Sequence, residues 1–109
     1  MTPEQLELIT SITRIALSGA QQTGLRVMHD VRSDTDERGT YVVSEIRIVN
    51  RALEPLHKTM VQIDEAGHDE VPTLLYLPDN IDYGERTLVQ QRDELVEFIA
   101  THRKQEAAA

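Results

Sequence analysis

The stretch that decides the fold is residues 25–50, which read LRVMHDVRSDTDERGTYVVSEIRIVN. Apolar and polar residues alternate over 25–32, and β-branched residues crowd 40–50, so both segments are predicted to be strands. The polar segment 33–39 between them ends in Gly39, which is typical of a hairpin loop. The first half of the chain is therefore predicted to contain an antiparallel β-hairpin.

Two further strands are predicted beyond this hairpin, at 57–64 and 71–77, joined by the polar turn 65–70. The second of them is flanked by Pro72 and Pro78, which cannot donate hydrogen bonds to a ladder, so we expect it at a sheet edge. Consecutive strands with short connections usually pair with their neighbours in sequence. The expected sheet is a four-stranded antiparallel meander.

Helices are predicted on both sides of the strands, over 3–22 and 83–104, from apolar residues at steps of three, four and seven. A capping-box pattern opens each of them, at residues 2–5 and 82–85, and Gly24 is suited to end the first. Leu6 and Leu17 are expected to widen the buried stripe of the first helix, and Val89 and Val96 are assigned to the core stripe of the second.

The predicted fold class is thus α+β with the order α-β-β-β-β-α, in a single domain over 1–105 with a frayed tail at 106–109. Both helices are expected on one face of the sheet. The opposite face is rather apolar for a surface in water, so we expect self-association there as a homodimer. The residues assigned to this self-association are Met28, Tyr41 and Val43.

The amino-acid composition excludes some classes of function and makes others less favourable. Among 109 residues there are 11 basic and 19 acidic side chains, and the net charge of −8 makes nucleic acid and anionic membranes poor partners and a basic protein surface a good one. The chain has no cysteine, which excludes disulfides and thiolate chemistry. It shows no signal-peptide pattern at its start and no apolar run near the roughly 20 residues of a membrane span, so a cytoplasmic location is expected.

The predicted meander also determines at which end of the sheet the acidic loops lie. The loops after the first and third strands must lie at the same end of the sheet, roughly 10 Å apart. The second helix is expected to return to this end and to bring His102, Arg103 and Lys104 toward it. The loop carboxylates that we predict to bind a basic partner are Asp34, Asp36, Glu37, Asp64, Glu65, Asp69 and Glu70. The alternative is that hairpin tips are acidic because they face water.

No motif predicts a metal site, a cofactor or catalytic residues. Residues 34–45 match an EF-hand loop at four positions, but Arg38 occupies a ligand position and the flanking segments are strand-like. The acidic turn around His68 lacks the helical spacing of specific metal sites. Neither a nucleophile motif nor a glycine-rich phosphate loop is present.

The best hypothesis from sequence is a non-enzymatic, acidic protein–protein interaction module of the binder, adaptor, chaperone or inhibitor type. One alternative is a small-ligand-binding domain with its pocket between sheet and helices or at a dimer seam. For that function the expected polar contacts are His29, Tyr76 and Tyr83. A third possibility is an enzyme whose site has no recognisable sequence pattern.

Overall fold

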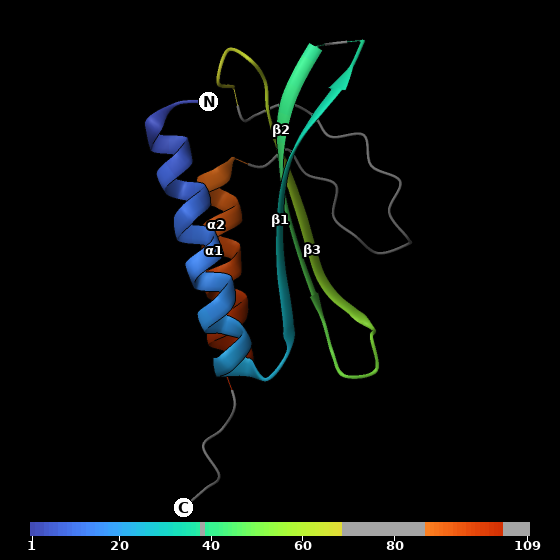
Figure 1. Cartoon of the computed structure of the whole chain (residues 1–109). Coiled ribbons are helices and arrows are strands. Elements are labelled where there is room, and N and C mark those ends of the chain that lie inside the picture. Colours follow the sequence, from blue (N-terminus) through green and yellow to red (C-terminus); the bar gives the residue numbers. More distant parts are fainter. Residues whose placement is uncertain (38, 69–86, 104–109) are drawn as a thin grey trace, which may run out of the picture.

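The computed structural model describes residues 1–37, 39–68 and 87–103 (Figure 1). These residues form two helices and one antiparallel three-stranded sheet of order β1-β2-β3, which confirms the α+β class. The predicted fourth strand, 71–77, lies outside the described residues. The elements in chain order are α1 (Pro3–Thr23), β1 (Arg26–Asp36), β2 (Gly39–Val49), β3 (Pro55–Ile63) and α2 (Leu88–His102).

The β1–β2 hairpin is longer than the sequence predicted. Its register runs without interruption from Arg26 opposite Val49 to Asp36 opposite Gly39. The prediction of a loop over 33–39 was therefore wrong for residues up to 36. The polar end of β1 stays in the ladder because it lies opposite the β-branched and aromatic start of β2, which holds the strand pair together.

Helix α1 begins and ends as predicted. The hydroxyl of Thr2 accepts a hydrogen bond from the Gln5 amide at 3.2 Å, and the Gln5 side chain accepts one from the Thr2 amide at 2.8 Å. At the other end Gly24 adopts a left-handed conformation with φ 73°, and its amide donates to the carbonyl of Ala20. This conformation suits glycine because it has no Cβ to clash with the backbone.

Helix α2 begins five residues later than predicted. Thr87 is the N-cap, with an extended backbone at ψ 164°, and its hydroxyl accepts from the Gln90 amide at 3.2 Å. The Gln90 side chain in turn accepts from the Thr87 amide at 2.9 Å. The prediction of helix at Thr87 was wrong, because Thr87 and Gln90 form the capping box that opens α2. The predicted start at Tyr83 and the box predicted at 82–85 lie outside the described residues.

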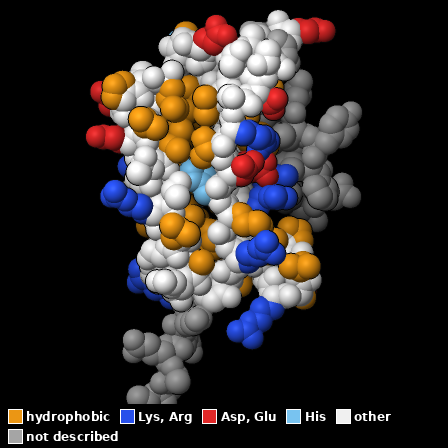
Figure 2. All heavy atoms as spheres, viewed as in Figure 1, with side chains coloured by type: hydrophobic (Ala, Val, Ile, Leu, Met, Phe, Trp, Pro, Cys, Tyr) orange, Lys and Arg blue, Asp and Glu red, His pale blue; other side chains and the backbone are white. Residues whose placement is uncertain are grey.

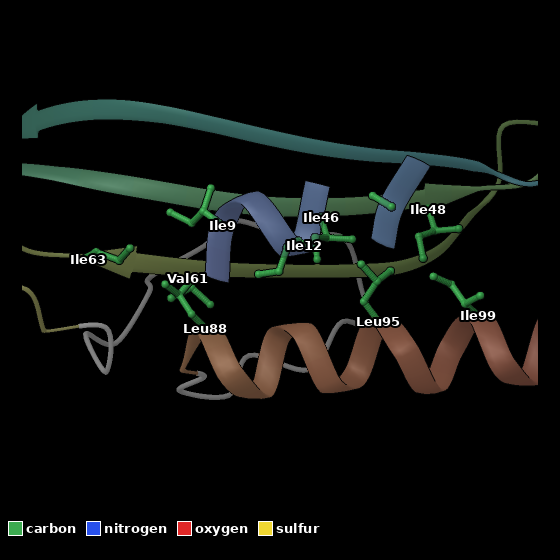
Figure 3. Close-up of a cluster of buried hydrophobic side chains, with 10 residues drawn as sticks. Ile9, Ile12, Ile46, Ile48, Val61, Ile63, Leu88, Leu95 and Ile99 are labelled. Atoms are coloured by element: carbon green, nitrogen blue, oxygen red, sulfur yellow. The ribbon is translucent and has the colours of Figure 1, made fainter. Parts of the chain in front are cut away.

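Both helices cover the same face of the sheet, and the core lies between the two layers (Figure 1). Figure 3 shows Leu88, Leu95 and Ile99 of α2 pointing toward isoleucines and valines of β2 and β3. The helices approach closely at Gly19, where a Cβ atom would lie only 2.3 Å from Cδ1 of Ile99. Four residues that we had assigned to the buried stripes are instead exposed, because they flank the stripe: Leu6, Leu17, Val89 and Val96.

The two helices run parallel, so their C-terminal ends lie together. Arg103 donates to the side chain of Gln22 at 2.9 Å, one helix end against the other. The prediction that the second helix returns to the acidic loops was wrong. Because β3 finishes at the end of the sheet where α2 starts, His102 and Arg103 lie at the opposite end (Figure 1).

Candidate functional site

The turn after β1 and the turn after β3 lie at the same end of the sheet, as the meander predicted. The Thr40 amide donates to Oε1 of Glu65 at 3.1 Å, which joins the two turns directly. The start of α1 lies at this end as well, because the Gln5 side chain donates to the carbonyl of Gly67. We call the surface formed by residues 34–37, 64–68 and the first turns of α1 the acidic end.

The predicted partner-binding carboxylates have different surroundings at the acidic end. Asp34, Glu37 and Glu65 are exposed, whereas Asp64 is half-buried and shapes its own turn. The carboxylate of Asp64 accepts hydrogen bonds from the His68 amide at 2.9 Å and from its ring at 3.1 Å. The backbone hydrogen bond from His68 is the main reason why the pKa of Asp64 lies below its ordinary value, so this carboxylate stays ionised. Asp36 belongs to β1, and Asp69 and Glu70 lie outside the described residues.

Two acidic residues of this surface were missed by sequence reasoning, which considered only the loops. Glu4 and Glu7 lie on the first turns of α1, at the end where Gln5 meets Gly67. Figure 2 shows acidic side chains gathering toward this end and basic ones toward the middle and the other end. The basic residues on the lower half of the described sheet, in the turn after β2 and at the end of α2 are Arg26, Arg47, Arg51, Lys58 and Arg103.

A chain of polar side chains crosses the molecule between the sheet and the helices, with one member from each of the five elements. The hydroxyl of Thr13 and Nδ1 of His29 are 2.7 Å apart, and Nε2 of His29 is 2.7 Å from the hydroxyl of Ser44. Ser44 donates to Oε1 of Gln91 at 2.8 Å, and the Gln91 amide reaches the hydroxyl of Thr59 at 3.3 Å. We call these five residues the helix-face cluster.

The order of donors in this cluster fixes the histidine tautomer. Since Ser44 gives its proton to Gln91, His29 donates to Ser44 from Nε2. In the neutral ring Nδ1 then accepts from the Thr13 hydroxyl, which also lies 3.2 Å from the carbonyl of Ile9. Burial lowers the pKa of His29, and the nearby carboxylate of Asp30 opposes this only in part. The ring is therefore neutral near pH 7 and completes the chain of donors.

This Ser–His pair does not behave as a nucleophile and its base. Ser44 and Gln91 are fully buried, at 0% exposure, so the hydroxyl cannot meet a substrate in this structure. Both ring nitrogens of His29 are already engaged within the protein. Tyr76 and Tyr83, which were predicted to share a ligand site with it, lie outside the described residues. The cluster ties the five elements together.

The opposite face of the sheet carries a charged cluster that sequence reasoning missed. The Glu45 carboxylate, on a side chain only 9% exposed, lies 3.3 Å from Arg32, 3.2 Å from Arg47 and 3.8 Å from Lys58. Arg32 also pairs with Asp30 along β1. We call these five residues the outer-face cluster. Charged residues at alternate positions of β1 and β2, together with Lys58 of β3, were the available signal, but the strand register brings them together.

The predicted self-association residues share this outer face. Val43 is 1% exposed and is already buried within the single chain. Met28 and Tyr41 are half-buried. A contact of this face with a second copy would therefore have to use other side chains than Val43.

Metal binding finds little geometric support in the described residues. Asp34 and Glu45, the first and last positions of the EF-hand-like pattern, belong to β1 and β2, whereas the EF-hand requires flanking helices. Within the ranges that the structure describes, no three His, Asp or Glu side chains gather as a metal site would require.

In comparisons with known proteins, no family model, curated protein or solved structure matches the chain. Neither α1 nor α2 is long and apolar enough to cross a membrane, and the other described residues contain no such helix. The surfaces and contacts above are therefore the basis for assigning a function.

Proposed function

We propose that this chain is a non-enzymatic interaction module that docks a basic surface of a partner protein through its acidic end. The observation that carries the proposal is the hydrogen bond from Thr40 to Glu65 at 3.1 Å. It joins two turns that are separate in sequence, so carboxylates from both turns form one surface. Preorganised charges of one sign give a partner a single orientation in which to bind.

The distribution of charge over the rest of the molecule supports this role. The five basic residues named above lie away from the acidic end, so the described residues carry a charge asymmetry in addition to the net charge of −8 of the chain. Such an asymmetry orients a charged partner during diffusional encounter and raises the association rate. The docking contact should accordingly weaken as salt concentration rises.

The experiment compares two variants that lose the same charge. Asp34→Asn with Glu37→Gln neutralises two exposed carboxylates at the acidic end, and Asp93→Asn with Glu97→Gln neutralises two exposed carboxylates on α2. Each protein is used to capture partners from a lysate of the native host at low salt, with quantitative mass spectrometry. We expect proteins that the wild type and the α2 variant retain to be lost from the acidic-end variant.

A captured partner is then purified and its association rate measured. The acidic-end variant should bind at least about tenfold more slowly, and the α2 variant at nearly the wild-type rate. Equal capture and equal rates for all three proteins would show that the acidic end is only a solvated surface.

A further inference from the structure

Strand β1 has an open edge in the described sheet, because β2 is its only neighbour there. The Thr40 amide points away from β1, toward Glu65, so Asp36 and Gly39 form the hydrogen-bonded pair that closes the hairpin. Alternation along the strand then turns the N–H and C=O groups of every second residue toward the open edge. These residues are Val27, His29, Val31, Ser33 and Thr35.

Charged side chains occur along this edge, but three other features that protect an edge strand are absent from it: short length, proline and a bulge. It is 11 residues long, contains no proline, and keeps its register with β2 without a bulge. Its centre is open to solvent, with Val31 41% exposed and the side chain of Asp30 58% exposed. Such a strand is a template for pairing with another strand.

Apolar side chains accompany the edge on the helix layer. Leu6, Thr13 and Leu17 follow one another at steps of seven and four on α1, and Thr13 contacts His29 of β1. Both leucines therefore lie on the β1 side of the helix, where they are 54% and 66% exposed. Figure 2 shows hydrophobic side chains gathering over α1 and the seam that it forms with β1.

We propose that a second copy of this chain pairs antiparallel with the open edge of β1, about a two-fold axis at Val31. The two sheets then become one continuous sheet. In this register Arg26 lies opposite the partner copy's Asp36, and Asp30 lies opposite the partner copy's Arg32. By symmetry each of these backbone pairs occurs twice, and the two pairs of Asp30 with Arg32 place unlike charges opposite each other on the outer face. Directly opposed charges of unlike sign stabilise a strand pair.

The charges distinguish this register from its neighbours. Moving the axis to His29 sets Arg26 against the partner copy's Arg32, and moving it to Ser33 sets Asp30 against the partner copy's Asp36. Both shifts also shorten the paired segment. Only the axis at Val31 uses the full strand and opposes no like charges.

The charge asymmetry of the whole molecule agrees with antiparallel pairing. A two-fold axis across β1 places the acidic end of one copy beside the more basic end of the other. The proposed contact also covers the exposed leucines of α1 near the axis. Backbone pairing, apolar contact and charge therefore favour the same arrangement.

The test exploits charge reversal at the two central positions. The dissociation constant of the dimer is measured by sedimentation equilibrium for the wild type, Asp30→Arg, Arg32→Asp and the double variant D30R/R32D. Each single change opposes like charges in two symmetric places, so we expect the dissociation constant to rise at least about tenfold. The double variant restores opposite charges and should dimerise like the wild type.

A mixture of the Asp30→Arg and Arg32→Asp variants gives the most specific test of the proposed register. A chain with two arginines at positions 30 and 32 should pair with a chain with two aspartates there, although neither pairs with itself. Asp93→Arg makes the same change in net charge as Asp30→Arg, but on α2, and should leave the dimer intact. A monomeric wild type, or single variants that dimerise normally, would overturn the proposal.

Arg32 also contacts Glu45, so each variant is checked by circular dichroism, and Asp30→Arg carries the conclusion if Arg32→Asp unfolds. Val31→Lys supplies a second disruption at an exposed position on the axis. It should yield a folded monomer. A folded Val31→Lys dimer would contradict the proposed edge pairing.

Discussion

Ser44 and Glu45 are neighbours on β2, yet they belong to clusters that stabilise the fold in different ways. Ser44 points toward the helices, where the groups of the helix-face cluster are neutral and are linked by hydrogen bonds. Glu45 points to the outer face, where one carboxylate holds three cations that are 21% to 53% exposed. The stability of the first cluster depends on hydrogen-bond geometry, and the stability of the second depends on the balance of charges.

The two clusters should therefore respond to different conditions. Buried neutral hydrogen bonds are insensitive to salt, but they are costly to leave unpaired. Partly exposed ion pairs are screened by salt and contribute less each. Substitutions that break one cluster at a time therefore separate the contributions of the two clusters to the free energy of unfolding.

The largest effect is expected for Gln91→Leu on the helix-face cluster. Leucine fits a buried helix position, but it leaves the hydroxyl of Ser44 without its acceptor and the carbonyl of Ser44 without its side-chain donor. The free energy of unfolding should fall by about 2–3 kcal/mol in urea titrations. The control is Gln21→Leu at an exposed position of α1, which should change it by less than about 0.5 kcal/mol. A similar loss in both variants would argue against the cluster.

A smaller effect is expected for Glu45→Gln on the outer-face cluster. The amide keeps the shape of the side chain but no longer neutralises Arg32, Arg47 and Lys58, which then repel one another. Because these cations are partly exposed, we expect a loss of about 1–2 kcal/mol at low salt. The loss should shrink at high salt, measured by urea titration at both ionic strengths. A loss that is independent of salt would mean that Glu45 acts through packing.

The smallest effect is a dependence of stability on pH through His29. Burial lowers the pKa of this ring in the folded state, so between that pKa and the ordinary value of 6.5 the unfolded chain binds more protons. This contribution is present above pH 6.5 and is lost as pH falls through the interval below it. Melting temperatures should drop between pH 7.5 and 5, and the drop should be smaller in His29→Gln. An equal drop in both proteins would assign the effect to other histidines.

Local sequence patterns were enough to predict most elements of this fold. Alternation located the first part of β1, and β-branched residues located β2. The capping box at Thr2 with a glycine at position 24 located both ends of α1. The same-end placement of the two acidic turns also followed from sequence, since each hairpin reverses the chain. These features depend on residues that are close together in the sequence.

The rest depended on contacts between distant residues. Gln91 and Ser44 are 47 positions apart, and nothing near either residue indicates the other. Glu45 gathers its cations only through the register of three strands. The direction of α2, and with it the position of Arg103, depended on the end of the sheet from which the helix starts. Burial of Val43 on the outer face was not visible from strand alternation either.

The close approach of α1 and α2 at Gly19 has a consequence for synthesis of the chain. The helix ends meet through Arg103 and Gln22, which are 81 positions apart. While the ribosome is making the intervening segment, α1 and the hairpin have emerged without Leu88, Leu95 and Ile99 to complete their core. The nascent chain therefore exposes apolar surface until α2 leaves the ribosomal exit tunnel, and during that period chaperones can bind it.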